Sequence, residues 1–404
     1  MKEISLKKFE ELNKDSYVLI DIRDESARDY GMIPGAIAIS FDGDENEAVE
    51  KLSAISPDKK LILYCDFGRK TKDLDDHEAL QGRDCYSLEG GYTGYICSRI
   101  SEFDDIEEKR KKAERSIQKK FHESLFAPFA KACKIYKLIE EGDRIAVCIS
   151  GGKDSMLMAK LFQEIQKHGH CNFELTFLVM DPGYNSENRA LIESNAKALG
   201  IPITIFESTI FDAVDTIVKS PCYICARMRR GYLYRKAQEL GCNKIALGHH
   251  YDDVIETIFM GIMHSGQIQT MMPKLHSTNF EGMELIRPMY LIREEDIKHW
   301  CNYNELKFIA CACKMTEKRD TSVNPGDVSK RAEVKELIKE LREKSPYIES
   351  NIFKSVENVH LNAIISYKTN KTGRHHFLDT YDEGDFKEIY ERTGKQQTNI
   401  YNRT

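Results

Sequence analysis

Ser150-Gly151-Gly152-Lys153-Asp154-Ser155 is the stretch that decides the fold of this 404-residue chain. It follows a short apolar run over residues 144–149 that is typical of a buried parallel strand. Apolar residues then recur at helix spacing over residues 157–165. A strand, a loop of small residues and a helix turn backbone N–H groups and a positive helix end toward a phosphate. The pattern predicts a phosphate-binding loop in an α/β fold, rather than an ordinary strand-to-helix turn that happens to hold two glycines.

The loop lacks the spacing of the Walker motif, in which Gly-Lys-Ser/Thr ends a longer loop. It resembles instead the PP-loop of enzymes that split ATP between the α- and β-phosphates and adenylate a substrate. The resemblance implies that ATP is bound by six residues, namely Ser150, Gly151, Gly152, Lys153, Asp154 and Ser155.

The composition is that of a soluble globular protein, with 41% hydrophobic and 31% charged residues. The first residues lack the apolar core of a signal peptide, and no apolar run approaches the roughly 20 residues that cross a bilayer. We therefore expect a cytoplasmic protein that does not bind a membrane. Twelve cysteines in such a protein favour thiol or metal chemistry over a disulfide framework.

Charge divides the chain near residue 104. Residues 1–104 hold 14 Lys and Arg against 23 Asp and Glu, and the remainder holds 45 against 42. We predict a front domain over 1–104, a rear domain over 105–366 and a polar extension over 367–404. Any nucleic acid is expected on the rear part. The charged run 107–115 is interpreted either as a solvated linker helix or as a basic helix that contacts RNA phosphates.

Cys65 follows an apolar strand over residues 60–64 and opens a short loop that leads into a helix. The N–H groups of such a loop, together with Arg69 and Lys70, stabilise a thiolate and equally a persulfide anion. The loop resembles the active-site loop of rhodanese-like domains. Three flanking stretches match that family in order, at residues 19–23, 31–37 and 88–92. The resemblance spans residues 1–104 and implies a rhodanese-like α/β domain in which Cys65 carries a persulfide.

Two further groups of residues carry chemistry in the rear part. Cys222 and Cys225 are three residues apart, and Cys311 and Cys313 come much later. Spacing alone leaves a [4Fe–4S] cluster and a zinc ion equally open. The segment 248–257, Gly-His-His-Tyr-Asp-Asp-Val-Ile-Glu-Thr, follows an apolar strand, so its polar groups lie where open α/β sheets bind ligands.

With these residues in view, residues 118–361 resemble the TtcA family, the tRNA 2-thiocytidine synthetases. The resemblance rests on residues 139–155, 222–235, 244–257 and 286–288. It implies a parallel-sheet PP-loop domain and a [4Fe–4S] cluster held by Cys222, Cys225 and Cys313, with Cys311 as the alternative third ligand. It also implies tRNA as a partner and a possible homodimer.

The chemistry expected from this resemblance is ATP-dependent adenylation of a tRNA base, followed by sulfur transfer. We expect Asp154 and Asp253 to bind Mg²⁺ and Asp252 to orient the base. Arg227, Arg229 and Arg230 either contact tRNA phosphates or form a solvated helix face.

Sulfur would come from Cys65, loaded by a cysteine desulfurase or another sulfur donor. Thiolation of another tRNA nucleoside or of a small molecule is one alternative, and a non-catalytic sulfur or cluster carrier is the other. His249 and His250 are either acid–base groups or hydrogen-bonded polar residues at a strand end.

Overall fold

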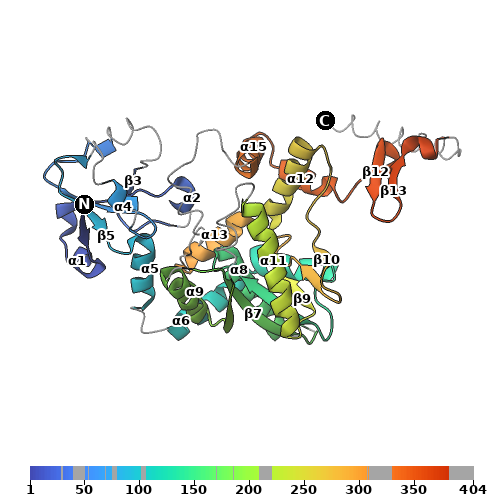
Figure 1. The fold of residues 1–404 in the computed structure, drawn as a ribbon, viewed down its shortest axis with the longest axis horizontal. Helices are drawn as coiled ribbons and strands as arrows, with labels where there is room; N and C mark the ends of the chain where they lie inside the picture. The colour runs from blue at the N-terminus through green and yellow to red at the C-terminus, as the bar shows by residue number, and fades with distance from the viewer. Residues whose placement is uncertain are drawn as a thin grey trace. The chain divides into compact units, whose positions relative to one another are not determined.

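A computed structural model describes the chain except for residues 29–30, 40–50, 53, 69, 75–79, 102–105, 170, 185, 209–220, 307, 309–329 and 382–404. Contacts divide the chain into two units. One comprises Met1–Thr257 and Met271–Glu333, and the other comprises Ile258–Thr270 and Val334–Thr404. The first unit contains two sheets, and the second contains a two-stranded hairpin (Figure 1).

The first sheet has five strands in the order β1-β5-β4-β2-β3, paired in parallel. Their bounds are β1 Lys2–Ile4, β2 Tyr17–Asp21, β3 Ile37–Ala38, β4 Lys60–Tyr64 and β5 Cys85–Leu88. Helices α1 (Leu6–Glu10), α2 (Glu25–Arg28), α4 (Lys70–Asp73) and α5 (Gly91–Ser101) connect the strands or follow them. Alternate residues of β4 enter different apolar clusters: Ile62 lies in one and Leu63 in the other. Both faces of β4 are therefore buried, as expected for a parallel sheet covered on two sides.

The second sheet has six strands in the order β10-β11-β9-β6-β7-β8, and only β10 runs antiparallel to its neighbour. The strands are β6 Arg144–Ile149, β7 Glu174–Asp181, β8 Ile203–Glu207, β9 Lys244–Ala246, β10 Lys274–His276 and β11 Glu284–Ile286. The helices are α6 Ile106–Gln118, α7 Ala127–Ile135, α8 Lys153–His168, α9 Ser186–Leu199, α11 Pro221–Glu239, α12 Tyr251–Ser265 and α13 Glu294–Tyr303.

Helices cover both faces of this sheet. Val147 and Ile149 of β6 pack in a large cluster with residues of α6, α7, α8, α9 and α13. Cys148 points to the opposite face and packs with residues of α11 such as Tyr234. The result is a helix–sheet–helix sandwich, which confirms the predicted mixed α/β architecture with a mainly parallel sheet.

Helix α6 is anchored in this second core. The Lys160 ammonium lies 2.9 Å from the Glu114 carboxylate, and the Ser116 hydroxyl accepts hydrogen bonds from Trp300 Nε1 at 3.0 Å and Asn304 Nδ2 at 3.1 Å. Ile117 is fully buried. One face of the charged run therefore belongs to the core, so the helix is not solvated on every side, and its contact with RNA phosphates stays a prediction.

The second unit includes most of α15 (Lys330–Lys344), α16 (Ile348–Ser355) and the hairpin of β12 (Ser366–Thr369) and β13 (Gly373–His376). Among the helices that the structure describes, none has the length and apolarity needed to cross a membrane.

Ser116→Ala should destabilise the second core, because it leaves the buried Trp300 N–H and the Asn304 amide without their shared acceptor. We expect the free energy of unfolding to fall by about 1–3 kcal/mol. The chain holds one tryptophan, so the urea dependence of its fluorescence reports on this core. Ser350→Ala, at a half-buried serine whose hydroxyl donates an exposed hydrogen bond to the Tyr347 carbonyl, is the matched control. An unchanged urea midpoint for Ser116→Ala would contradict this account of the anchor.

Candidate active sites

The predicted phosphate loop joins β6 to α8, and Ser155 closes it. The Ser155 hydroxyl oxygen accepts a hydrogen bond from Ser150 N at 3.2 Å and donates one to the Gly152 carbonyl at 2.9 Å. Gly151 has φ +85°, and a Cβ there would lie 2.5 Å from the Ile192 side chain. Both the backbone angle and the space therefore require glycine at 151. The loop ends at the first turn of α8, where N–H groups lack helical partners and favour an anion.

Lys153 is 4% exposed, and its charge is balanced by two carboxylates. Its Nζ lies 3.1 Å from Asp154 and 3.2 Å from Glu294, the first residue of α13. The ion pair with Glu294 joins the loop to α13. A phosphate that binds Lys153 would have to share it with these carboxylates, so the role predicted for Lys153 stays a prediction.

The segment after β9 packs directly on the phosphate loop. A Cβ at Gly248 would lie 3.3 Å from Ser155 N and 3.4 Å from the Asp154 carbonyl carbon. This close approach brings the predicted residues 249–253 beside the loop. The structure thus brings together two predicted segments, 150–155 and 249–253, that lie about 100 positions apart in the sequence.

Asp252 and Asp253 both lie in the first turn of α12, but they have different partners. Asp252 accepts the Glu294 N–H at 2.7 Å and pairs with Arg293 at 3.3 Å, so it holds the start of α13. Asp253 accepts the His250 N–H at 3.0 Å and pairs with Arg331 at 3.3 Å. Burial raises the pKa of Asp253, but His250 and Arg331 lower it more, so its net pKa is below the usual range.

The magnesium ligands predicted at Asp154 and Asp253 stay a prediction. Among the described residues, no group of three or more His, Cys, Asp and Glu side chains is arranged to hold a metal ion. Two carboxylates are nevertheless enough for Mg²⁺ when phosphate oxygens and water complete the shell.

Sequence reasoning assigned no role to Arg287, which follows β11 directly. It is 6% exposed and donates a hydrogen bond to the Met272 carbonyl. Burial, and then the charge of Arg230, lower the pKa of Arg287 to about 10. Burial, and then Arg287, lower the pKa of His249 to about 4, which keeps that imidazole neutral at pH 7. A role for Arg287 could have been predicted from the strand that precedes it. Strand β11 pairs with β9, and this pairing places Arg287 next to the segment after β9.

The cysteine pair lies at the start of α11. Cys222 and Cys225 occupy helical positions three apart, which share one face of a helix. Further along α11, Met228 and Tyr232 pack against Met180 near the carboxyl end of β7. The first turns of α11 therefore lie toward the edge of the sheet that carries the phosphate loop. Cys311 and Cys313 lie outside the described residues, so the cluster ligands Cys222, Cys225 and Cys313, with Cys311 as the alternative, stay a prediction.

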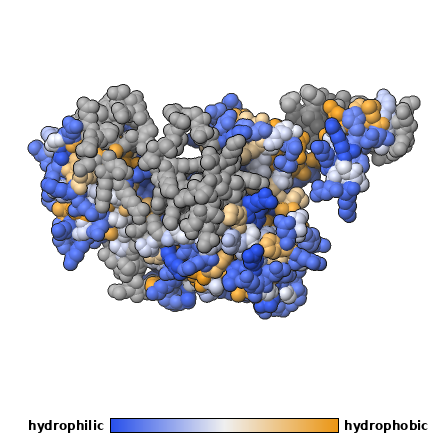
Figure 2. Space-filling view, viewed as in Figure 1, coloured by the Kyte–Doolittle hydropathy of each residue, from blue (hydrophilic) through white to orange (hydrophobic). Residues whose placement is uncertain are grey.

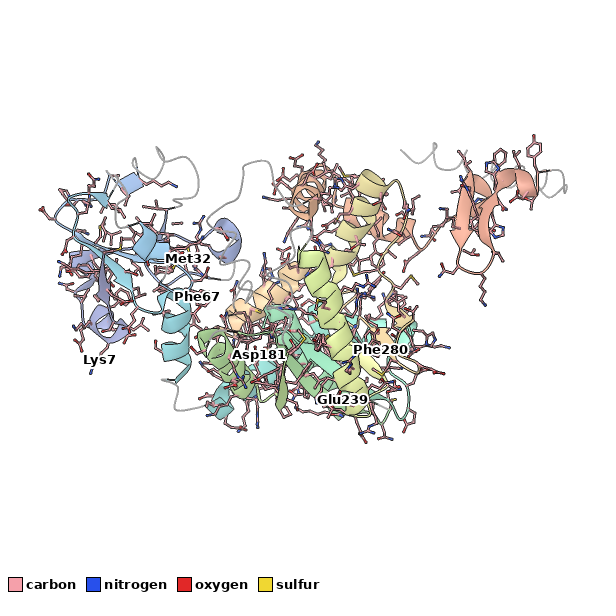
Figure 3. The ribbon with its side chains drawn as sticks, viewed as in Figure 1. Lys7, Met32, Phe67, Asp181, Glu239 and Phe280 are labelled. Atoms are coloured by element: carbon pink, nitrogen blue, oxygen red, sulfur yellow. The ribbon has the colours of Figure 1, made fainter. Side chains whose placement is uncertain are left out.

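In the first sheet, Cys65 follows β4 and is 3% exposed, with a free thiol. The carbonyl of Cys65 accepts the Tyr92 N–H at 2.8 Å, and that of Asp66 accepts the Thr93 N–H at 3.0 Å. The loop that holds Cys65, with Phe67 labelled in Figure 3, is thus bound through its carbonyls to the start of α5. Arg69 lies outside the described residues.

A buried arginine supports this loop. The Arg23 guanidinium binds the Asp21 carboxylate at 2.6 Å and lies 3.7 Å from the centre of the Tyr92 ring. It also lies 3.7 Å from the carboxylate of Asp66, the residue after Cys65. Tyr64 donates a hydrogen bond to Asp21 at 2.7 Å. The network fixes the residue next to the thiol from the buried side of the loop.

Gly91→Ala should abolish sulfur loading on Cys65. A Cβ at Gly91 would lie 2.3 Å from the Cys65 carbonyl oxygen and 2.6 Å from Gly68 N, and φ there is +56°. Gly82→Ala is the matched control, because Gly82 has φ +75° but nothing within 4 Å. Both variants should lose about 1 kcal/mol from backbone strain, and only Gly91→Ala should lose the adduct of about 32 Da that mass spectrometry detects after exposure to a sulfur donor. Equal loading of both variants would contradict the account of the loop.

Comparison with known proteins identifies both parts of the chain. The PP-loop domain family matches residues 114–317, which is half of the chain, and the rhodanese-like domain family matches residues 5–96. The tRNA-cytidine(32) 2-sulfurtransferase of Pelobacter propionicus is 36% identical over 57% of this chain and 83% of its own length. That of Acaryochloris marina is 33% identical over 61% of this chain and 84% of its own.

Among solved structures, the U34-tRNA thiolase NcsA from Methanococcus maripaludis with its [4Fe-4S] cluster is similar with a TM-score of 0.45. It is 23% identical, and the match covers 57% of this chain and 76% of that one. By its PP-loop domain and its sequence identity, the chain belongs to the tRNA-cytidine(32) 2-sulfurtransferase family, whose members are tRNA sulfurtransferases of the PP-loop type, and it carries a rhodanese-like domain at its N-terminus.

Proposed function

We propose that this protein thiolates a cytidine of tRNA at C2, using ATP and a persulfide carried on its own Cys65. The observation that carries the proposal is the packing of Gly248 against the first turn of α8, which places residues 249–253 beside the phosphate loop. A site that binds both a nucleotide phosphate and the base to be activated needs this juxtaposition. The names of the family members, tRNA-cytidine(32) 2-sulfurtransferase, support the choice of substrate.

The first half-reaction is adenylation of the base. The C2 oxygen of cytidine attacks the α-phosphorus of ATP, and pyrophosphate leaves. The N–H groups at the start of α8 would bind the phosphates, and Asp154 and Asp253 would hold Mg²⁺ to offset their charge. Asp252 is tied to the start of α13 through the Glu294 N–H, so we assign it to positioning that helix and, through it, the base.

The second half-reaction replaces the activated oxygen. A sulfur nucleophile at the oxidation level of sulfide attacks C2, the C–O bond breaks, and AMP leaves with the oxygen. When this sulfur comes from the Cys65 persulfide, an external two-electron donor such as a thiol cleaves the S–S bond and returns the Cys65 thiol. Arg287 and the neutral His249 flank this region with one positive charge and one uncharged hydrogen-bonding group. A fixed cation near the departing AMP stabilises the negative charge that develops on its phosphate.

Cys222, Cys225 and Cys313 would hold a [4Fe–4S] cluster, which supplies an iron without a protein ligand that is able to bind sulfur. Cys311 is the alternative to Cys313. Of the proposed cluster ligands, Cys222 and Cys225 lie on the described backbone of α11, and their spacing supports this assignment.

Sulfur would arrive on Cys65. A donor such as a cysteine desulfurase transfers sulfur to the Cys65 thiolate, and the loop bound to α5 holds the resulting persulfide. Fusing the carrier to the enzyme raises its effective concentration to roughly the millimolar range when the connection allows both sites to meet.

The reaction itself is tested with the anaerobically purified full-length protein, unmodified tRNA, ATP, Mg²⁺ and sulfide. We expect AMP and pyrophosphate to form in a one-to-one ratio with 2-thiocytidine, measured by nucleoside mass spectrometry of digested tRNA. Thiolation of a uridine instead would support the proposed adenylation and sulfur transfer but would show that the substrate is not cytidine. If the protein fails to split ATP in the presence of tRNA, the proposed function is wrong and the protein is a non-catalytic sulfur carrier.

Cys65→Ser should remove thiolation when a persulfide donor is the only sulfur source, because serine cannot accept sulfur. Cys85→Ser, at another cysteine of the same sheet that forms no disulfide, is the control and should retain wild-type activity. Inorganic sulfide should restore the Cys65→Ser variant, which shows that its rear domain is intact. Full activity of Cys65→Ser with the persulfide donor would remove Cys65 from the pathway.

A further inference from the structure

The C-terminal hairpin lies outside both family matches, which end at residues 96 and 317. Strands β12 and β13 pair in an antiparallel register that sets Lys368 opposite Arg374 and Tyr367 opposite His375. Figure 2 shows hydrophilic residues over much of this hairpin, with hydrophobic residues beside them. A two-stranded hairpin is marginally stable by itself in water, so a partner would add stability that its own contacts do not supply.

One face of the hairpin gathers positive charge. Because side chains alternate along a strand, Ser366, Lys368, Arg374 and His376 share one face. Like charges directly opposite each other destabilise a sheet, and Lys368 and Arg374 are such a pair.

These charges are not neutralised within the described part of the chain. The Arg374 guanidinium donates hydrogen bonds to the Ser366 hydroxyl at 3.1 and 3.3 Å, and neither Lys368 nor Lys371 has a carboxylate partner there. Asp379 is the one acidic residue within 359–381, and its carboxylate accepts the His376 N–H at 2.7 Å. The face is therefore suited to an anionic partner.

Aromatic rings accompany the cations. Tyr367 and His375 stack on the opposite face with ring centres 4.8 Å apart, and the Phe377 ring lies 4.8 Å from His376 and 6.2 Å from Tyr381. Tyr381 is 57% exposed. Of these rings, Phe377 and Tyr381 are exposed, and they follow the strand that carries Arg374. Exposed rings near cations are a combination that binds RNA, because the rings stack on unpaired bases while the cations neutralise phosphates.

We propose that this hairpin is a second contact surface for the tRNA substrate, with Lys368, Lys371 and Arg374 on its phosphodiester backbone. The inference rests on the proposed function, since it takes tRNA as the partner. An acidic protein surface would satisfy the cations equally, but it offers no bases for the exposed rings.

The test compares tRNA affinity of the full-length holoenzyme and its variants over a range of salt concentrations, by fluorescence anisotropy. The triple variant Lys368→Gln, Lys371→Gln, Arg374→Gln should bind tRNA roughly tenfold or more weakly, with a salt slope shallower by about 2. The matched control Lys7→Gln, Lys8→Gln, Lys14→Gln removes the same charge from exposed lysines near the N-terminus and should bind within about twofold of wild type.

A charge-retaining triple variant, Lys368→Arg, Lys371→Arg, Arg374→Lys, separates charge from folding. It should bind tRNA with an affinity within about threefold of wild type, since the affinity for phosphates depends mainly on the positive charge of the side chain. Wild-type affinity and salt slope in the glutamine triple variant would overturn the inference and leave the proposed function intact. A change in its oligomeric state without a change in tRNA affinity would also overturn it, in favour of an acidic surface of a second copy. Absence of tRNA binding by the wild-type protein would instead refute the proposed function.

Discussion

The parallel register of β6, β9 and β11 is the constraint on which the rest of the rear domain depends. Ala246 of β9 lies between Val147 of β6 and Ile286 of β11, so three chain segments end at one edge of the sheet. The phosphate loop comes after β6, the segment 249–253 comes after β9, and Arg287 comes directly after β11. The absence of a side chain at Gly248 then lets the segment after β9 lie close against the start of α8.

Charge at this edge is distributed unevenly. Lys153 lies between two carboxylates, Asp252 holds Arg293, and Asp253 holds Arg331, so each of these acids has a cationic partner. Arg287 differs, because it is buried with a carbonyl as its hydrogen-bond acceptor and another arginine nearby. Its buried Nε has no hydrogen-bond partner among the described residues, so an arriving anion would supply one. The edge therefore suits negatively charged substrates before any of them binds.

The sequence predicted those features that depend on a few adjacent residues. The stretch 150–155 indicated a strand, a loop and a helix, and the residues around Cys65 indicated a second loop of the same kind. Each of these motifs is local, and the structure forms each from the expected elements. The anchoring of helix α6 was harder to predict, because most of its sequence is charged. The structural role of Ser116 depends on hydrogen bonds from Trp300 and Asn304, which lie far away in the sequence. Arg23 and Arg287 were missed for the same reason: their partners come from distant strands and loops, and spacing along the chain does not reveal them.

The central claim is that the phosphate loop and the cysteines of α11 serve one reaction. It is tested most directly by metal analysis and EPR spectroscopy of the anaerobically purified protein, recorded with and without a non-hydrolysable ATP analogue. The account predicts about four iron atoms per chain and a reduced-cluster spectrum that changes when the nucleotide binds. Zinc in place of iron, or a spectrum that the nucleotide leaves unchanged, would contradict it.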